Sequence, residues 1–382
     1  MERINLKKVL FSSCGFQIKC IKVFDYVIGG ILCELLPPIK KYNFNQPIDS
    51  SSIKKVLIIR PGGIGDAVLS FPFIREIKHI FNAKIDLLVD ARNQEVFNLT
   101  PGLIDNIFCY NRGCILNLIL KLRKNDYDVI FDTEQWHNFS AITAYLSGAK
   151  IIVGFNTRKS RYKFYTHPVT YLQNDYEAYS FLRLLSALAP HKARMELNIP
   201  FLEPPDAAFT YSDGLDRDKK RIVLCLSASI TERRWPLQKL RELMGVLLFK
   251  NFCVVLIGGR KEISCVNSMI KDVHNKNLLN FVGRLNLKQT VAILKQGDIF
   301  IGFDSGILHL ACALGLPTIS FFGAGIKEKW ALQYERHIVL HKNLSCSPCT
   351  IFGYTSHCPR GVECMRSISV DEVVSAVDKL CR

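Results

Sequence analysis

Short apolar runs alternate with longer amphipathic segments along most of the chain. Between the short runs, apolar residues recur every three or four positions, as they do on one face of a helix. Strands that alternate with helices predict parallel sheets covered by helices, so the pattern predicts an α/β fold. The chain of 382 residues is long enough for two such domains. The runs of strand length are residues 55–60, 84–90, 127–132, 151–155, 221–226, 252–257, 299–303 and 318–322.

Changes in composition divide the chain into three predicted segments. Residues 1–53 contain a basic amphipathic leader and a polar linker. Residues 54–205 form the first predicted domain, and residues 206–382 form the second. Residues 190–220, which are rich in proline and polar side chains, connect the two domains.

The leader carries an apolar stripe at helical spacing. Charged side chains interrupt it before it reaches the ~20 apolar residues that a membrane span needs. We therefore expect a helix that lies on a bilayer, where flanking lysines favour anionic lipids. A helix that packs on the body of the protein is the alternative. The stripe comprises Ile21, Phe24, Ile28, Ile31 and Leu35, widened by Val27, Leu32 and Leu36, and the flanking lysines are Lys7, Lys8, Lys40 and Lys41.

A strand, a helix and a second strand are predicted within residues 299–323. The first strand ends in Asp304, Ser305 and Gly306, and a helix-length segment follows. Asp304 or Ser305 can cap this helix, and Gly306 lets a ligand approach the backbone. The start of a helix binds phosphate, and His309 lies within about one turn of it, so both can contact one anion. The alternative is a capped, buried helix with His309 in the core.

A glycine-rich loop that ends in an acid follows the first strand of the first domain. Residues 61–66 contain Gly63, Gly65 and Asp66. A dinucleotide-binding domain has a glycine-rich turn at this place, but its spacing is G-x-G-x-x-G, which this loop lacks. Asp66 can cap the next helix, a role that is compatible with chemistry at the same carboxylate. Pro72 either kinks that helix or marks its effective start.

Polar side chains also follow the strand at residues 127–132. Asp132, Glu134 and Gln135 stand there, and the carboxyl ends of parallel strands form the ligand-binding edge of a sheet. All three are therefore candidates for binding a substrate, with ordinary loop polarity as the alternative. Four basic residues within residues 158–163 either grip phosphate groups or form a solvated charge run.

Three motifs resemble those of a known enzyme family. Residues 304–323 read D-S-G-x-x-H-L-x-x-A-L-G-x-P, followed by an apolar strand and F-G. With R-R-W-P at residues 233–236 and G-D at residues 65–66, this order resembles the ADP-heptose:lipopolysaccharide heptosyltransferases, glycosyltransferase family nine. The resemblance runs from residue 55 to the end of the chain. It implies the GT-B architecture, in which two Rossmann-like domains face a cleft.

The resemblance also implies roles for individual residues. It implies an inverting glycosyltransferase that uses neither a metal nor a cofactor, with Asp66 as the general base and Gly63, Gly65, Asp132, Glu134 and Gln135 on the acceptor side. Arg233 matches a basic residue that contacts the donor phosphates, and Glu262 matches an acid that binds the ribose. An S-A-S sequence at residues 227–229 replaces the usual turn, which leaves the nucleotide and the sugar open. The expected donor site comprises Ser227, Arg233, Arg234, Glu262, Asp304, Ser305, Gly306 and His309.

Charge and family resemblance together indicate the partners. Lys and Arg outnumber Asp and Glu by 50 to 34, and the resulting charge of +16 favours anionic partners. No nucleic-acid-binding signature accompanies this charge, so nucleic acid is not expected as a partner. The resemblance implies a nucleotide-sugar donor, ADP-heptose, and a phosphorylated, lipid-linked saccharide of the lipopolysaccharide inner core as acceptor. The expected location is the cytoplasm, peripheral on the anionic inner face of the cytoplasmic membrane.

The cysteine pattern fits a reducing cytoplasm. Fourteen cysteines are spread through a long chain that shows no secretory signal, which does not suit a disulfide scaffold. Cys346, Cys349, Cys358 and Cys364 lie in one short span that begins with C-x-x-C. They either hold a structural zinc ion or an iron–sulfur centre, or remain reduced thiols in a loop.

Three other functions stay open at this point. A transferase of the same fold can use another nucleotide sugar. An NAD-dependent oxidoreductase also has paired βαβ units, but it requires the dinucleotide fingerprint. A binding or scaffold protein without activity is possible because the S-A-S turn departs from the family.

Overall fold

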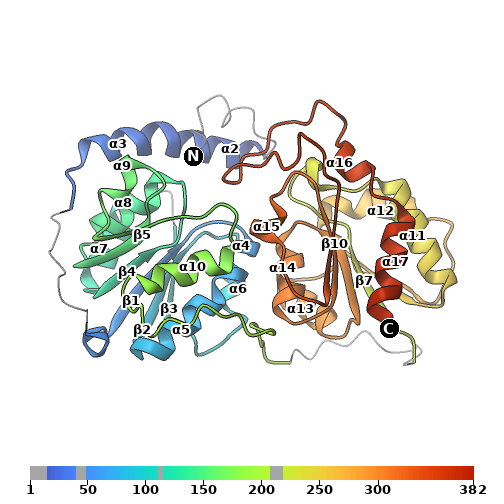
Figure 1. Cartoon of the computed structure of the whole chain (residues 1–382), viewed down its shortest axis with the longest axis horizontal. Coiled ribbons are helices and arrows are strands. Elements are labelled where there is room, and N and C mark those ends of the chain that lie inside the picture. The colour runs from blue at the N-terminus through green and yellow to red at the C-terminus, as the bar shows by residue number, and fades with distance from the viewer. Residues whose placement is uncertain (1–14, 40–48, 111–114, 207–217) are drawn as a thin grey trace. The chain divides into compact units, whose positions relative to one another are not determined.

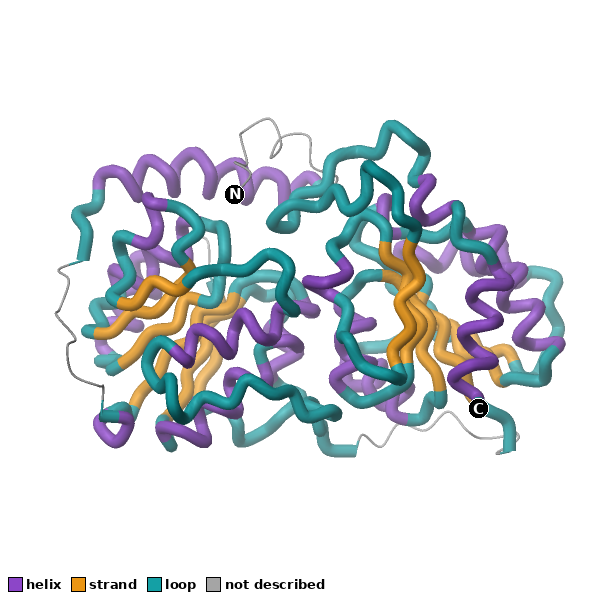
Figure 2. Tube along the Cα trace, viewed as in Figure 1, coloured by secondary structure: helices purple, strands orange, loops and turns teal. Residues whose placement is uncertain are grey.

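The computed structural model describes residues 15–39, 49–110, 115–206 and 218–382. They divide into two compact units, one that runs from Gly15 to Asn198 and one that runs from Ile199 to Arg382. Within each unit, helices cover both faces of a six-stranded sheet whose neighbouring strands are parallel (Figure 1 and Figure 2). The α/β class with parallel sheets that the sequence predicts is therefore confirmed.

The sheet of the first unit has the strand order β3-β2-β1-β4-β5-β6. Its central strands are buried along nearly their whole length because helices cover both faces, which is why they read as unbroken apolar runs. The strands are β1 (Lys55–Arg60), β2 (Lys84–Val89), β3 (Asn106–Cys109), β4 (Val129–Asp132), β5 (Ile151–Phe155) and β6 (His167–Val169).

Two helices follow β1 where the sequence predicted one segment. Ser70 separates them, and Pro72 lies in the first turn of the second helix, where its missing N–H costs nothing. Pro72 therefore marks a helix start. The helices of this unit are α4 (Ile64–Leu69), α5 (Phe71–Phe81), α6 (Gln94–Phe97), α7 (Ile115–Lys124), α8 (Asn138–Leu146), α9 (Lys159–Tyr162) and α10 (Glu177–Ser186), with a 3₁₀ turn, η2 (Ser50–Ser52).

The leader forms α2 (Phe16–Phe24), a π-helical turn η1 (Asp25–Gly29) and α3 (Gly30–Leu35). The π-helical turn η1 packs on α8, and α3 packs on α8 and α9 of the first unit (Figure 1). The leader therefore packs on the first unit, as the alternative predicts, but much of the stripe stays exposed and its contact with a bilayer stays a prediction. The flanking lysines Lys7, Lys8, Lys40 and Lys41 lie outside the described residues. Among the helices that the structure describes, none has the length and apolar character needed to cross a membrane.

The sheet of the second unit has the strand order β12-β11-β10-β7-β8-β9. The strands are β7 (Arg221–Cys225), β8 (Cys253–Ile257), β9 (Leu278–Asn280), β10 (Ile299–Phe303), β11 (Thr318–Phe322) and β12 (His337–His341). The helices are η3 (Thr231–Arg233), α11 (Leu237–Phe249), η4 (Arg260–Glu262), α12 (Ile263–Ile270), α13 (Leu287–Lys295), α14 (Gly306–Ala313), α15 (Lys327–Trp330), α16 (Glu363–Arg366) and α17 (Val370–Cys381).

A buried tryptophan fixes the entry to α11 in the second unit. The Trp235 ring stacks on Phe321 of β11 with ring centroids 5.0 Å apart, and its Nε1–H donates to the Ile368 carbonyl at 3.1 Å. A buried indole needs such a partner for its N–H. The R-R-W-P motif therefore anchors its arginines to the sheet, which holds Arg233 and Arg234 next to the strand ends.

Candidate functional site

The strand order of each sheet reverses at one position, and the predicted site residues follow the strands there. In the first unit the reversal lies between β1 and β4, and in the second it lies between β7 and β10. The carboxyl ends of strands at such a switch point form the ligand-binding crevice of open α/β sheets. Each unit therefore presents one candidate half-site.

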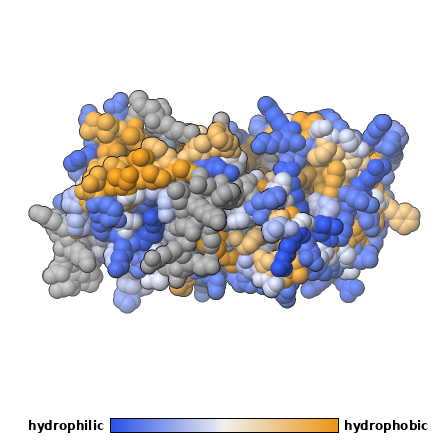
Figure 3. All heavy atoms as spheres, turned by 90° about the horizontal axis from the view of Figure 1, so that it is seen from above, coloured by the Kyte–Doolittle hydropathy of each residue, from blue (hydrophilic) through white to orange (hydrophobic). Residues whose placement is uncertain are grey.

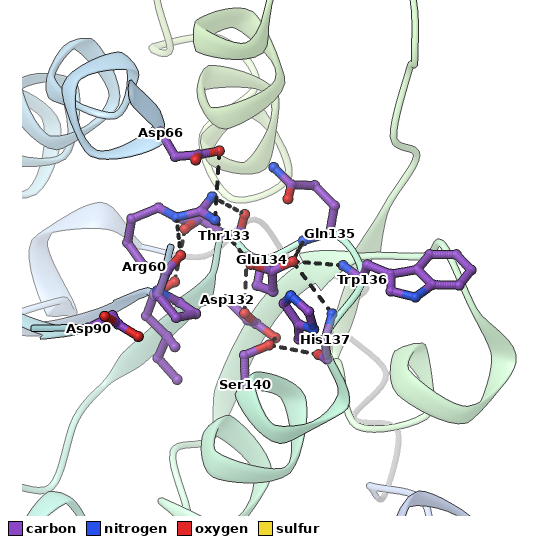
Figure 4. Close-up of polar contacts among 12 residues, drawn as sticks. Arg60, Asp66, Asp90, Asp132, Thr133, Glu134, Gln135, Trp136, His137 and Ser140 are labelled. Carbon is purple, nitrogen blue, oxygen red and sulfur yellow. Dashed lines mark hydrogen bonds and ion pairs between the residues drawn. The ribbon is translucent and has the colours of Figure 1, made fainter. Parts of the chain in front are cut away.

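Arg60, the last residue of β1, organises the half-site of the first unit (Figure 4). Its guanidinium is buried, and it donates from Nη1 to the Thr133 carbonyl at 2.9 Å and from Nη2 to Glu134 Oε2 at 3.1 Å. Asp66 Oδ1 lies 4.0 Å from the same Nη2. Burial by itself would lower the pKa of Arg60, but Asp66 and Glu134 raise it, so this group is a fixed positive charge.

Asp66 lies in the first turn of α4 with a side chain that is 26% exposed. Gly63 is the N-cap of this helix and Gly65 is its second residue, so the expectation that Asp66 is the N-cap is wrong. Gly62 has a φ of 136°, and a side chain there would meet Arg60 Nη2 at 3.3 Å. The loop therefore needs glycine in order to pass over the buried guanidinium.

The buried Glu134 side chain stabilises the loop after β4 by accepting hydrogen bonds from its backbone. Its Oε1 accepts the backbone N–H groups of Gln135 and Trp136, both at 3.0 Å, while Oε2 contacts Arg60. Burial would raise the pKa of Glu134, but the charges of His137 and Arg60 lower it to about 2. Glu134 is therefore an anion that holds the shape of the loop.

Asp132 is completely buried at the end of β4. Its Oδ2 accepts hydrogen bonds from Arg161 Nη2 at 3.1 Å, Tyr165 Oη at 2.6 Å and Ser140 Oγ at 3.1 Å. Arg161 is one of the four basic residues at 158–163, and its guanidinium has no exposed surface. It neither grips phosphate at the surface nor belongs to a solvated charge run, so both expectations fail for Arg161.

The three acceptor-side candidates after β4 therefore lie together, but each contacts an internal partner. Gln135 Nε2 donates to Glu177, which also accepts from Tyr171 Oη at 3.0 Å. Glu134 and Asp132 are tied to arginines in the same way. Their contact with a substrate stays a prediction. The side chain of Asp66 is 26% exposed, which is more than those of Glu134 and Asp132.

Sequence reasoning missed two charged residues of this half-site, Arg60 and Asp25. Asp25 of η1 accepts the N–H groups of Asn138 at 3.0 Å and Phe139 at 2.9 Å, and Oδ2 lies 3.4 Å from His137 Nδ1. It caps α8 because the N-cap residue, His137, makes no side-chain capping bond. An arginine at the end of an apolar strand was the available signal for Arg60, since arginine is rarely buried without partners.

In the second unit, α14 begins at a serine that does not cap it. Ser305 occupies the N-cap position, but its side chain makes no capping hydrogen bond, so the expected side-chain cap is absent. Ser305 Oγ is buried and has no hydrogen-bond partner among the described residues. The first N–H groups of a helix have no intrahelical partner. This helix start can therefore receive an anion.

Arg233 lies beside the start of α14. Its Nη1 donates to the Asp304 carbonyl at 3.3 Å and lies 3.2 Å from Asp304 Oδ2. Its Nε is buried without a hydrogen-bond partner within the part of the chain that the structure describes. Gly325 passes so close to Asp304 Oδ2 that a side chain at this position would collide with it. Asp304 therefore links Arg233 to the helix start, and Gly325 leaves room for it.

Ser227 and Glu262 form a second cluster after β7 and β8. Ser227 Oγ donates to Glu262 Oε2 at 2.8 Å and accepts the Gly259 N–H at 2.8 Å. Arg234 Nη2 donates to Glu262 Oε1 at 3.0 Å. Both carboxylate oxygens are thus engaged, so a ribose at Glu262 would compete with Ser227 or Arg234, and this predicted contact stays a prediction.

His309 lies one turn into α14, and Gly306 is the first residue of that helix. The imidazole is buried, with its ring centroid 6.0 Å from that of Trp330. Burial fits the core-histidine alternative, while the position near the helix start fits the predicted role at an anion. The donor-site candidates therefore form two groups in contact, Arg233 with Asp304, and Ser227 and Arg234 with Glu262.

The four clustered cysteines lie near one another in the second unit. Burial and the neighbouring thiols of Cys364, Cys358 and Cys346 raise the pKa of Cys349 to about 11. Within the described ranges, no group of three or more His, Cys, Asp or Glu side chains is placed to hold a metal ion. Metal analysis of protein purified without oxygen would distinguish the metal-bound and reduced-thiol alternatives.

Comparison with known proteins connects these half-sites to one family. A family model described as glycosyltransferase family 9 (heptosyltransferase) matches residues 115–356. Lipopolysaccharide heptosyltransferase 1 of Campylobacter coli is 24% identical over 356 residues, which cover 85% of this chain and 98% of that protein.

Solved structures share the fold. The Escherichia coli ADP-heptose lps heptosyltransferase II is 21% identical with a TM-score of 0.64, covering 85% of this chain and 98% of that one. A glycosyl transferase family 9 protein from Veillonella parvula is 17% identical with a TM-score of 0.69, covering 87% and 98%. This likeness confirms the predicted GT-B class. Because the family model spans well over half of its length, the chain belongs to glycosyltransferase family 9, the heptosyltransferase family.

Proposed function

We propose that the protein transfers a heptose from ADP-heptose to a lipid-linked saccharide of the lipopolysaccharide inner core. We also propose that the transfer inverts the anomeric carbon and proceeds without a metal ion. The similar proteins support this choice of donor and acceptor, since one is a lipopolysaccharide heptosyltransferase and another is an ADP-heptose lps heptosyltransferase. The observation that carries the proposal is the uncapped start of α14 beside Arg233.

The donor diphosphate would bind at this helix start. Ser305 Oγ and Arg233 Nε are buried without hydrogen-bond partners among the described residues, and each such group costs about 1–3 kcal/mol. A bound diphosphate would accept hydrogen bonds from both groups and from the first N–H groups of α14. The same donors would stabilise the negative charge that develops on the leaving diphosphate, which is the task a metal ion performs in other enzymes.

Asp66 would act as the general base in a single displacement. The acceptor hydroxyl oxygen forms a bond to the anomeric carbon, the bond from that carbon to the diphosphate oxygen breaks, and the hydroxyl proton moves to the Asp66 carboxylate. The partly exposed side chain and the position at the switch point support this assignment. Arg60 lies close enough to orient the carboxylate.

The proposed acceptor fixes the place of the reaction. A lipid-linked inner-core saccharide is exposed to a cytoplasmic enzyme only at the inner face of the cytoplasmic membrane. The net charge of +16 supports work at this anionic surface. We therefore propose a cytoplasmic enzyme that associates peripherally with the membrane.

Thermal stabilisation by nucleotide sugars tests the donor. Ligand at about 100 times its dissociation constant adds roughly 2.7 kcal/mol to the free energy of unfolding. We expect ADP compounds to raise the melting temperature, UDP-, GDP- and CDP-sugars and NAD to leave it unchanged, and Arg233→Ala to abolish the shift. Arg241→Ala, at a largely exposed arginine of α11, is the matched control. A shift with another nucleotide would discard the heptose but keep the transferase.

Turnover of an Asp66→Asn variant tests the base. The side-chain amide of asparagine cannot accept the proton of the acceptor hydroxyl. We therefore expect turnover to fall by roughly 100-fold or more, while the affinity for the donor stays nearly unchanged. Glu95→Gln, at an exposed acid of the same unit, should retain full turnover. Unchanged turnover in Asp66→Asn would remove Asp66 as the base. A wild-type protein that binds donor but transfers nothing would favour the scaffold alternative, and retained anomeric configuration in the product would contradict inversion.

A further inference from the structure

The leader exposes an apolar strip on its outer side. Ile31 is 54% exposed and Leu35 is 75% exposed, and both belong to the apolar stripe predicted from the sequence. Residues three or four positions apart share one side of a helix, so the exposed side chains follow one another along the leader. In Figure 3, hydrophobic side chains gather in a band on the side of the molecule where the leader lies in Figure 1. The apolar strip comprises Phe16, Val27, Ile28, Ile31 and Leu35. Phe24 does not belong to it, because its ring stacks on Phe139 of α8 with ring centroids 5.4 Å apart.

The opposite side of the leader attaches it to the first unit. Asp25, Gly29 and Cys33 are its buried residues among those described. A side chain at Gly29 would meet Asn138 Cβ at 2.9 Å, so the leader backbone approaches α8 directly. Asp25 adds hydrogen bonds to the start of α8. Attachment therefore uses the inner side. On the outer side Ile31 and Leu35 remain more than half exposed, and Ile28 is 38% exposed.

The charges around the apolar strip are mostly positive. Lys19 lies on α2, and the exposed Lys159 lies on α9, which packs against α3. Lys22 lies on the inner side of α2, where its charge acts to lower the pKa of His137. In the described part of the leader, Glu34 is the exposed acid, because Asp25 is buried. A surface that combines an apolar strip with neighbouring lysines complements an anionic lipid surface.

We propose that the apolar strip docks the protein on an anionic bilayer. Its side chains enter the boundary between headgroups and acyl chains, while the neighbouring lysines contact anionic headgroups. This proposal rests on the proposed function only in that a lipid-linked acceptor gives the enzyme a reason to bind a membrane. A second copy of the chain is the competing occupant, but two copies of a protein with a charge of +16 repel each other.

Vesicle co-sedimentation tests the docking surface with the full chain. We expect the wild-type protein to sediment with vesicles of equal phosphatidylcholine and phosphatidylglycerol, and to bind phosphatidylcholine vesicles much more weakly. The variant Ile28→Gln/Ile31→Gln/Leu35→Gln should bind the anionic vesicles about tenfold less or weaker still, since binding scales with the buried apolar area. Glutamine keeps helix propensity, so the leader should remain folded. The control Leu237→Gln/Phe249→Gln removes exposed apolar side chains from α11 and should bind like wild type.

Three results would overturn the proposal: wild-type protein that does not bind anionic vesicles, a triple variant that binds as tightly as wild type, or a wild-type dimer that the triple variant dissociates in analytical ultracentrifugation. An unchanged melting temperature of the triple variant excludes misfolding. Because vesicle binding needs no donor or acceptor, failure of heptosyl transfer would leave the docking surface intact. Conversely, lost docking with full turnover on a water-soluble acceptor would leave the proposed heptosyl transfer standing.

Discussion

Replacing Asp25 by alanine should release the leader from the first unit. The carboxylate is 7% exposed and accepts the N–H groups of Asn138 at 3.0 Å and Phe139 at 2.9 Å. It thereby caps α8 from a distant part of the chain. Alanine removes both hydrogen bonds and leaves two N–H groups at the helix start without these acceptors.

The two lost hydrogen bonds determine the size of this effect. A hydrogen bond to a charged group contributes about 1.5–3 kcal/mol, and an N-cap side chain about 0.5–2 kcal/mol. Alanine has a better helix propensity than aspartate, which returns about 0.5 kcal/mol. We therefore expect Asp25→Ala to weaken the attachment of the leader by about 2–4 kcal/mol. The loss should appear as local opening, because the sheet core does not depend on these bonds.

Amide hydrogen exchange measures this local opening. A loss of about 2–4 kcal/mol corresponds to exchange that is roughly 30- to 1,000-fold faster, since 1.4 kcal/mol is a factor of ten. We expect this acceleration in residues 16–35 and at Asn138 and Phe139, with β1 unchanged. Glu34→Ala, at an exposed acid of α3, is the matched control and should leave exchange unchanged. Unaltered exchange in Asp25→Ala, or equal acceleration throughout the unit, would refute the reasoning.

Three further results are expected. Gly325→Ala should weaken ADP-heptose binding roughly tenfold or more in calorimetry, because the methyl group would displace Asp304. Glu134→Gln should lower the free energy of unfolding in urea by about 3 kcal/mol, because it leaves Arg60 buried without its nearest carboxylate. Burial would lower the pKa of His137, but nearby carboxylates, chiefly Glu134, raise it above 6.5. The stability that His137 contributes is therefore present below pH 6.5 and lost as the pH rises through its folded pKa, and His137→Gln should remove this part of the pH dependence.

Each of these results has a control and a contradicting outcome. Gly245→Ala adds a methyl group that meets no atom within 4 Å and should leave binding unchanged. If Gly325→Ala binds ADP-heptose with wild-type affinity, the position of Asp304 does not matter for donor binding. An unchanged free energy of unfolding in Glu134→Gln would show that the carbonyl partners of Arg60 are sufficient to stabilise its buried charge. Parallel stability profiles of wild type and His137→Gln above pH 6.5 would contradict the raised pKa.

The fold was predictable because its signals are local. Each central strand is an apolar run, and each helix that follows has its own periodicity, so the α/β class follows from short windows of sequence. Pro72 signalled a break in the segment after β1, although the sequence left open a kink or a helix start, and the structure places it in the first turn of α5. The same reasoning placed β10, α14 and β11 within residues 299–323.

The leader shows what local patterns leave undecided. Its apolar stripe predicted a helix, but the stripe alone does not say which side of the helix meets the protein. That choice depends on Asp25 and Gly29, whose partners Asn138 and Phe139 lie more than 100 residues away along the chain. Asp25 is buried and accepts hydrogen bonds at the start of α8, which stabilises the contact between the leader and α8. The spacing of apolar residues carries no information about such a contact.

The half-site of the first unit was predictable by position but not by contact. Asp132 and Glu134 stand at the carboxyl end of β4, as predicted. Their carboxylates face Arg161 and Arg60, however, and the sequence separation of these pairs hides the contact from any local pattern. A strand-end acid can serve a ligand or a buried arginine, and only the tertiary structure separates the two.

Both half-sites contain buried polar groups without hydrogen-bond partners among the described residues: Arg161 Nε in the first, and Ser305 Oγ and Arg233 Nε in the second. The latter two lie beside a helix start, which can receive an anion. Buried polar groups nearly always have partners, because an unsatisfied one costs about 1–3 kcal/mol. In the first unit Glu134 meets this rule through Arg60 and the backbone. In the second unit Ser305 Oγ and Arg233 Nε, both beside the start of α14, lack hydrogen-bond partners among the described residues. A bound anion would give both groups a hydrogen-bond partner, so we expect anion binding at this helix start to stabilise the second unit.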